Sequence, residues 1–254
     1  MGLGLGLGLE FRGLIGMRIV HQAMLLFGFL FAASAMANNG YAVSGAAYNL
    51  KTGKLAYREL FTALDVNGLV QVNYAKPDGI VFARKTLNYA TEVFQPGVEI
   101  TDERDEELVS ATFDAGRLLL THKKKGDSHT KTLYDTAKLV IDAGVDAFIQ
   151  LNWVKITSGK KVEFDVADAR NLGIEKFVIK EIDASASPLA YKGAAETWKY
   201  FRVETANKLS SIFVEPIFYA YEPDGKYLMR YQGRANIDND AGEAWDVRIE
   251  YEYF

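Results

Sequence analysis

Strict alternation of apolar and polar residues near the C-terminus is the feature that most restricts how this chain can fold. Every second residue from Tyr227 to Ile237 is apolar or small, and apolar residues alternate with charged ones from Trp245 to Tyr253. A period of two places successive side chains on opposite faces of a β-strand. The turn residues 238–242 lie between the two runs. We therefore predict a hairpin with one packed face and one solvated face.

Shorter alternating runs, separated by Gly-containing turns, continue through the chain from Tyr41 onward. We predict paired strands at 42–49 and 55–61, 69–75 and 80–89, 108–113 and 117–122, and 162–166 and 176–182. The 14 Tyr and 15 Phe residues suit strands. No linker-like stretch divides residues 38–254, so we expect a single β-rich domain of roughly a dozen strands.

One segment departs from this pattern. Apolar residues at helical spacing, among them Phe148 and Trp153, predict a helix at about 142–158, with Asp142 as its N-cap and Gly159 as its C-terminal stop. A large sheet needs its apolar face covered. The predicted fold class is therefore mainly β, a large curved antiparallel sheet or open half barrel with one main covering helix.

Residues 17–37 are typical of a cleavable export signal. Arg18 precedes the apolar run Ala23–Ala33, and Ala35-Met36-Ala37 forms a small-x-small cleavage site. The apolar run is shorter than the roughly 18–20 residues that a membrane-spanning helix needs. We expect cleavage after Ala37 and a periplasmic mature chain, with residues 1–16 as an extension before the signal. A Gly-rich arm that dips into the membrane is the alternative for residues 1–16.

Charge and composition exclude several classes of partner and chemistry. The chain has 29 Lys and Arg residues against 33 Asp and Glu residues, and its dense basic run, 123–125, is typical of a hairpin turn, so nucleic acid is not expected. There is no cysteine, which excludes disulfides, thiol nucleophiles and a lipid-modified cysteine. The fold must therefore depend on its hydrophobic core.

No constellation typical of catalysis or metal binding is present. His122 and His129 lie in a polar segment beside lysines, and no G-x-S-x-G motif occurs. The acidic run 102–107 and the spaced residues Asn236, Asp238 and Asp240 lack the glycine and terminal glutamate of a calcium loop, so we interpret both as solvated turns. We expect neither an enzyme nor a cofactor nor a metal site.

Glu59 is the main anomaly of the sequence. It shares a strand face with Tyr57 and Phe61, so the period that buries those residues also turns a carboxylate inward. A buried charge needs a partner, and Lys85 or Arg84 could supply it if the first two hairpins pair. Two interpretations stay open: a charge pair that sets strand register, and a polar anchor inside a ligand cavity.

The last strand argues against a β-barrel inserted in the outer membrane. A membrane strand exposes an apolar face to lipid. Phe254 shares its face with four charged residues: Glu252, Glu250, Arg248 and Asp246. We therefore expect that the mature chain does not span a membrane.

Four stretches carry a resemblance to known proteins. They are Tyr57-Arg58-Glu59, the run from Pro77 to Leu87, the run from Ile141 to Asp146, and Arg230-Tyr231-Gln232-Gly233 with Asn236-Ile237. On these residues the chain resembles a family of uncharacterised exported proteins of Gram-negative bacteria, a resemblance that covers nearly the whole mature chain and implies no activity. A curved sheet with a covering helix is also loosely similar, in fold alone, to the lipoprotein carriers of the periplasm.

Two functional hypotheses follow. The first is a periplasmic, non-catalytic binding protein that shelters an apolar or amphipathic small molecule or lipid between sheet and helix. Its predicted ligand-binding residues are Glu59, Arg84, Lys85, Phe148 and Trp153. The alternative is a structural or interaction protein of the cell envelope, with a filled core and no small-molecule ligand.

Overall fold

A computed structural model describes residues 40–134, 139–191, 197–206 and 215–254. The predicted export signal and the extension before it lie outside these residues. Within the described ranges, no helix has the length and apolar character that crossing a membrane requires.

The described residues form one sheet of 15 strands in the order β8-β7-β6-β5-β4-β3-β2-β1-β15-β14-β13-β12-β11-β10-β9. The elements are β1 (Tyr41–Asn49), β2 (Leu55–Thr62), β3 (Leu69–Ala75), β4 (Val81–Glu92), β5 (Gln95–Asp102), β6 (Glu107–Asp114), β7 (Arg117–Lys124), β8 (Asp127–Leu133), β9 (Leu139–Val140), α2 (Gly144–Leu151), α3 (Trp153–Thr157), β10 (Val162–Asp168), β11 (Gly173–Ile182), η1 (Ala184–Ala186), β12 (Lys199–Thr205), β13 (Ile217–Tyr221), β14 (Leu228–Asp238) and β15 (Ala244–Tyr253). Neighbouring strands are antiparallel except β9 and β10, which are parallel. The predicted mainly β fold class is confirmed.

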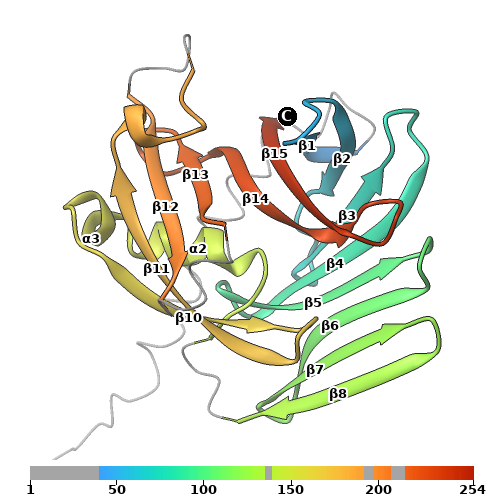
Figure 1. The fold of residues 1–254 in the computed structure, drawn as a ribbon. Helices are drawn as coiled ribbons and strands as arrows, with labels where there is room; N and C mark the ends of the chain where they lie inside the picture. Colours follow the sequence, from blue (N-terminus) through green and yellow to red (C-terminus); the bar gives the residue numbers. More distant parts are fainter. Residues whose placement is uncertain (1–39, 135–138, 192–196, 207–214) are drawn as a thin grey trace, which may run out of the picture.

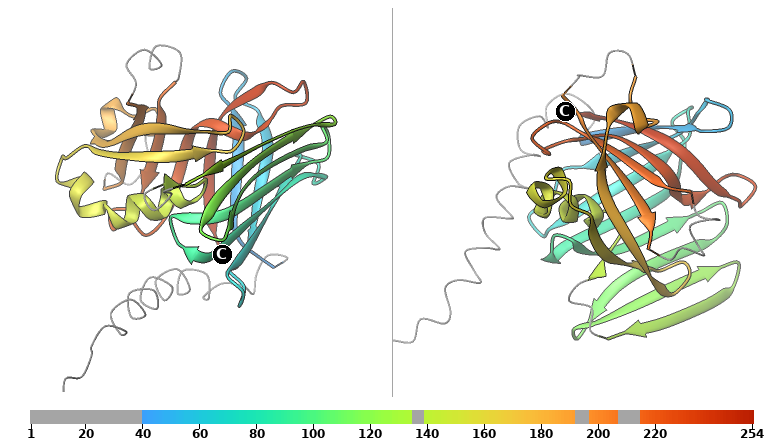
Figure 2. Two further views of the ribbon diagram at one scale, coloured as in Figure 1. Left: turned by 90° about the horizontal axis from the view of Figure 1, so that it is seen from below. Right: turned by 60° about the vertical axis from the view of Figure 1, so that its left-hand side comes forward.

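The sheet curls on itself. Figure 1 shows β1 to β8 on one side of the molecule and β10 to β13 on the other, with α2 between them. The two halves join where the first strand pairs with the last, with Val43 opposite Tyr253. The two further views in Figure 2 show the same curved wall partly enclosing the helices. The covering position predicted for the helical segment is confirmed.

The predicted hairpins are all present, and three of the five strands absent from the prediction have identifiable reasons. The edge strand β8 is exposed over most of its length, so neither face needs apolar residues and no alternation appears in its sequence. Strand β5 includes Pro96 and Gly97, residues that usually mark turns. Strands β9, β12 and β13 were also not predicted, and β9 has only two residues.

The predicted single helix is wrong in two respects. It is interrupted at Asn152, whose side-chain amide donates a hydrogen bond to the Phe148 carbonyl (2.9 Å), and two helices result. Asp142 is not the N-cap, a position that Ala143 occupies. Asp142 instead adopts a φ of 42°. The predicted stop is confirmed, because Gly159 follows α3 with a φ of 82°, the left-handed conformation that commonly ends helices.

Helix α2 begins in close contact with the turn between β4 and β5. The Phe94 carbonyl in that turn accepts a hydrogen bond from the Ile141 amide (3.1 Å). A Cβ added to Gly144, the first residue of α2, would collide with the backbone of Phe94. The helix therefore starts at a glycine because no side chain fits between it and the turn.

We predict that Gly144→Ala destabilises the protein by about 1–3 kcal/mol, because backbone atoms must move to admit the methyl group. Alanine in a helix is normally more favourable than glycine by roughly 1 kcal/mol, so the expected sign is reversed here. Urea denaturation measures the effect. The control is Gly173→Ala at the start of β11, where the added Cβ meets nothing nearer than 3.7 Å. Equal denaturation midpoints for the two variants would show that α2 is not seated on the turn.

Candidate functional site

A cavity of about 320 Å³ lies between the concave face of the sheet and α2. Ligand pockets in proteins typically enclose roughly 300–1,000 Å³, so the space suits a small molecule. Its wall is largely aromatic. The lining tyrosines are Tyr57, Tyr89, Tyr219, Tyr227, Tyr231, Tyr251 and Tyr253.

Strand β2 contributes two residues with polar side chains to the lining of this cavity. Tyr57 and Glu59 are two residues apart and so lie on the same strand face. Tyr57 is 0% exposed and Glu59 is 6% exposed, and both line the cavity. The inward orientation predicted for Glu59 from the strand period is confirmed.

Lys85 lines the same cavity from β4, but its ion-pair partner is Asp142 rather than Glu59. The Lys85 ammonium lies 2.8 Å from the Asp142 carboxylate. Asp142 also accepts hydrogen bonds from the Asn236 side chain (3.2 Å) and the Ala143 amide (2.7 Å). The predicted pairing of Glu59 with Lys85 or Arg84 is therefore wrong as a direct contact. Asp142 reaches the site from the segment before α2, which strand pairing alone does not reveal.

The predicted site residue Arg84 lies outside the cavity. Its side chain is half exposed on the other face of β4 and pairs with Glu103. The period of two accounts for this, because Arg84 and the inward-facing Lys85 are consecutive residues of one strand. Arg84 cannot contact a molecule bound inside the curved sheet.

Both members of the Lys85–Asp142 pair stay ionised. Burial acts to lower the pKa of Lys85, but Asp142, Tyr74 and Glu59 act more strongly together, and the pKa rises above its ordinary value. Burial acts to raise the pKa of Asp142, but Lys85 and the hydrogen bonds lower it. A buried ion pair of this kind is stable only with both partners present.

Glu59 has a weaker set of partners. The Tyr251 hydroxyl lies 3.3 Å from its carboxylate, and within the described ranges no cation lies within ion-pair distance of it. Gly45 stands opposite both Glu59 and Tyr251 in the sheet register, so the Tyr251 ring can extend over the glycine to reach the carboxylate. Burial raises the pKa of Glu59 to about 7, although Lys85 and Tyr251 act to lower it.

The hydroxyl of Tyr57 is a second polar group with too few hydrogen bonds. It is buried and has no hydrogen-bond partner among the described residues. The Tyr57 ring packs edge-on against Tyr74, with centroids 5.8 Å apart, and against Phe82 at 6.4 Å. The ring is therefore held in place by aromatic contacts, and its hydroxyl is enclosed without a hydrogen-bond partner among the described residues.

Helix α2 contributes another buried carboxyl group, Asp146. It accepts hydrogen bonds from the Tyr221 hydroxyl (2.6 Å) and the Gln150 side chain (3.0 Å). Burial raises the pKa of Asp146 to about 6. Asp146 was not predicted as a site residue, although its i, i+4 relation to Gln150 on a helix is visible in the sequence.

Phe148 and Trp153 do not line this cavity. Phe148 stacks on Phe164, with ring centroids 4.7 Å apart, and borders a different hollow. Trp153 packs edge-on against Phe201 (5.2 Å) and Tyr221 (5.7 Å). Both rings fill space between the helices and β10 to β13. The helical period correctly predicted that both side chains make apolar contacts. It does not distinguish a residue in the packed core from a residue that lines a cavity.

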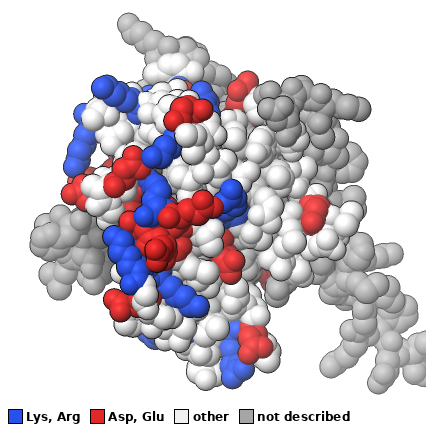
Figure 3. Space-filling view, turned by 90° about the vertical axis from the view of Figure 1, so that its right-hand side faces the viewer, with Lys and Arg blue, Asp and Glu red and all other residues white. Residues whose placement is uncertain are grey.

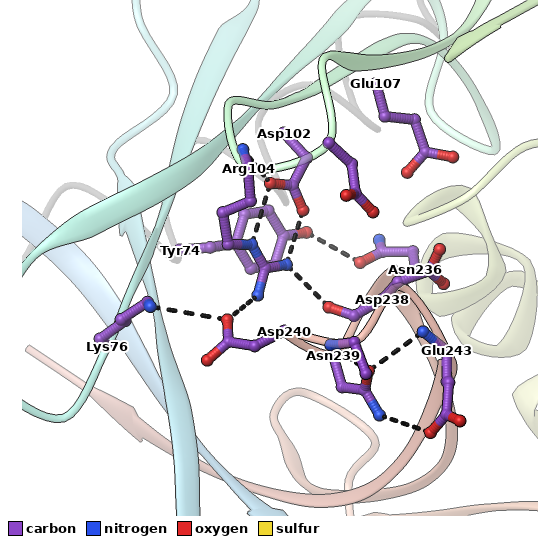
Figure 4. Close-up of polar contacts among 12 residues, drawn as sticks. Tyr74, Lys76, Asp102, Arg104, Glu107, Asn236, Asp238, Asn239, Asp240 and Glu243 are labelled. Carbon is purple, nitrogen blue, oxygen red and sulfur yellow. Dashed lines mark hydrogen bonds and ion pairs between the residues drawn. The ribbon is translucent and has the colours of Figure 1, made fainter. Parts of the chain in front are cut away.

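A separate network of charged residues joins the β5–β6 turn to the β14–β15 turn. Arg104 donates hydrogen bonds to the Asp102 and Asp240 side chains (2.6 and 2.7 Å) and to the Asp238 carbonyl (2.7 Å), as Figure 4 shows. Figure 3 shows acidic side chains gathered between lysines and arginines on this face. The two acidic runs interpreted as separate solvated turns thus lie together, and Asp102 and Asp238 are buried.

Further residues extend this network. Arg170, from the β10–β11 turn, pairs with Glu107 (3.1 Å) and Asp238 (2.7 Å). His122, from the polar segment that the sequence shows beside lysines, hydrogen-bonds with Glu107 (2.8 Å), and its side chain is only 23% exposed. No group of His, Cys, Asp or Glu in the described part of the chain has a metal-binding arrangement. The network holds three hairpins together through ion pairs.

A solved structure from Brucella abortus is similar to this chain in fold. It is described as a beta-barrel-like protein of the domain of unknown function DUF1849, and the two share 9% sequence identity with a TM-score of 0.43 over 84% of this chain and 98% of that chain. No family model and no curated protein matches the chain. Function must therefore be argued from the site itself.

We predict that the free energy of unfolding falls between pH 5 and pH 8, and that Glu59→Gln removes most of this fall. The pKa of Glu59 is about 7 when folded against an ordinary value of 4.5. The folded protein therefore holds a proton that the unfolded chain has released, and stability is lost as the pH rises through about 7. The contribution from Glu59 is on the order of 3 kcal/mol.

Urea denaturation at both pH values gives the comparison. Glu99→Gln on β5 is the matched control, because Glu99 is exposed, and it should keep the slope of the unmodified protein. Asp146 contributes in the same direction at lower pH, so a smaller fall should persist in Glu59→Gln. An unchanged slope in Glu59→Gln would contradict the burial of this carboxyl group.

Proposed function

We propose that this chain is a periplasmic, non-catalytic binding protein that shelters an apolar or amphipathic small molecule or lipid. The ligand occupies the cavity of about 320 Å³ between the sheet and α2. Tyrosine rings and aliphatic side chains such as Leu87 and Ile249 form the apolar part of the wall. Glu59, Lys85 and Asp142 form a cluster of charged side chains within it. A mainly apolar pocket with a few converging polar groups is the usual form of a small-molecule site.

The observation that carries this proposal is the unbonded hydroxyl of Tyr57. A buried polar group without a partner costs about 1–3 kcal/mol, and such groups are rare in native proteins. A bound ligand that reached past the cavity wall to this enclosed hydroxyl would satisfy it and recover that free energy. Ligand binding thus offers an explanation for the unpaired group.

Removing the Tyr57 hydroxyl tests this explanation. We predict that Tyr57→Phe leaves the empty protein as stable as before or stabilises it by about 1 kcal/mol, because an unsatisfied group is lost. Tyr221→Phe is the matched control. Tyr221 is equally buried, but its hydroxyl donates a hydrogen bond to Asp146 (2.6 Å), so this variant should be destabilised. Thermal denaturation compares the two, and equal destabilisation would show that the Tyr57 hydroxyl is bonded in the empty protein.

Occupancy of the cavity is tested with the apolar probe N-phenyl-1-naphthylamine, whose fluorescence rises in apolar surroundings. We predict saturable binding, abolished by Ala235→Phe, because Ala235 lines the cavity and a larger side chain fills it. Ala241→Phe in the exposed β14–β15 turn adds the same ring elsewhere and should bind the probe normally. Equal binding by both variants would place the probe outside the cavity.

Export to the periplasm is the other part of the proposal, and the signal-like residues 17–37 support it. We predict that the protein recovered from the periplasm of a Gram-negative host begins at Asn38. N-terminal sequencing measures this. Ala37→Leu should block processing, because signal cleavage needs a small residue at this position. Recovery of the unmodified chain with residues 17–37 still attached would contradict the proposal.

A further inference from the structure

The charges inside the cavity do not balance. Lys85 and Asp142 neutralise each other at 2.8 Å, and Glu59 beside them interacts electrostatically with both. When all three groups are ionised, this triad carries one surplus negative charge. An uncompensated buried charge is unfavourable, so the triad must acquire either a proton or an external cation.

The other charged residues that line the cavity do not supply this cation. Arg234 is exposed and pairs with Asp246 at 2.6 Å. Lys226 is exposed at the rim, with its ammonium 4.7 Å from the centre of the Tyr227 ring. Asp146 also lines the cavity, but it is a carboxyl group and cannot supply a cation. Both of its oxygens accept hydrogen bonds, from Tyr221 and Gln150. Asp146 is therefore better hydrogen-bonded than Glu59, whose carboxylate has a single long hydrogen bond from Tyr251.

The acceptors around Glu59 suit a group that donates several hydrogen bonds. Glu59 receives a single long hydrogen bond from Tyr251, and the hydroxyl oxygen of Tyr57 on the same strand face has no partner among the described residues. Burial is the largest cause of the raised pKa of Tyr57, and the charge of Glu59 is the next largest. The two groups are therefore electrostatically coupled. Tyrosine rings in the wall can attract a cation through their faces.

We propose that the sheltered ligand is an amphiphile with a protonated amine, and that its ammonium group binds at Glu59 and Tyr57. This inference rests on the proposed binding function and specifies its ligand class. The ammonium donates hydrogen bonds to the Glu59 carboxylate and the Tyr57 oxygen, and its apolar body lies against the aliphatic and aromatic wall. Where Glu59 is protonated in the empty protein, binding releases that proton to the solvent.

Other head groups fit less well. A carboxylate or phosphate would add a second negative charge beside Glu59 unless it bound a proton itself. A neutral alcohol could satisfy Tyr57 but would leave the charge of the triad unchanged. The preference for an amine over an alcohol is therefore the distinguishing property of this site.

The test is isothermal titration calorimetry with n-octylamine, n-octanol and octanoate, which share an apolar chain and differ in head-group charge. We expect the amine to bind at least about tenfold more tightly than the alcohol at neutral pH, and octanoate to bind most weakly. Amine affinity should rise from pH 6 to pH 8 while alcohol affinity stays constant. Titrations repeated in buffers of different ionisation enthalpy should show proton release on binding of the amine but not of the other two compounds.

Glu59→Gln should bind amine and alcohol with equal affinity. Tyr57→Phe, which keeps the charge of the triad, should weaken amine binding severalfold and serves as the test if Glu59→Gln does not fold. Alcohol or octanoate binding at least as tight as amine binding would overturn the head-group assignment and leave the cavity proposal standing. Binding of neither these compounds nor N-phenyl-1-naphthylamine would overturn the cavity proposal itself.

Discussion

The buried ion pair between Lys85 and Asp142 determines how the interior of this protein is arranged. Lys85 belongs to the first half of the sheet, and Asp142 lies two residues before the start of α2. Asp142 also bonds to Asn236 in β14 (3.2 Å), so one carboxylate joins the helix to both sides of the curled sheet. Because breaking a buried pair leaves an uncompensated charge, this arrangement keeps α2 in position above the cavity.

The position of this pair also accounts for the properties of Glu59. Lys85 is already neutralised by Asp142, so Glu59 gains only part of its favourable interaction. A glutamate paired directly with a lysine would stabilise the fold through its charge. Here the charged form of Glu59 opposes folding, and we infer that its place in the cavity serves binding rather than stability.

The sequence predicted the parts of the structure that depend on local periodicity. Alternation gave the hairpins and turned Glu59 inward, because a strand with one buried face repeats every two residues. The partner of Lys85 was not predictable. The sequence pattern predicted Asp142 as a helix N-cap, but its backbone adopts a φ of 42° and its side chain contacts Lys85. The contacts of Arg104 with Asp238 and Asp240 likewise depend on the curl of the whole sheet, whereas its contact with Asp102 is local.

The pairing of β1 with β15 has a consequence for how the chain folds. Val43 stands opposite Tyr253, so the central seam of the sheet joins strands from opposite ends of the described domain. Contacts between residues far apart in sequence form slowly, because loop closure must precede them. Strand β1 therefore has no neighbour on one edge until β15 has been synthesised. In this topology the last strand completes the sheet in the middle and not at its margin.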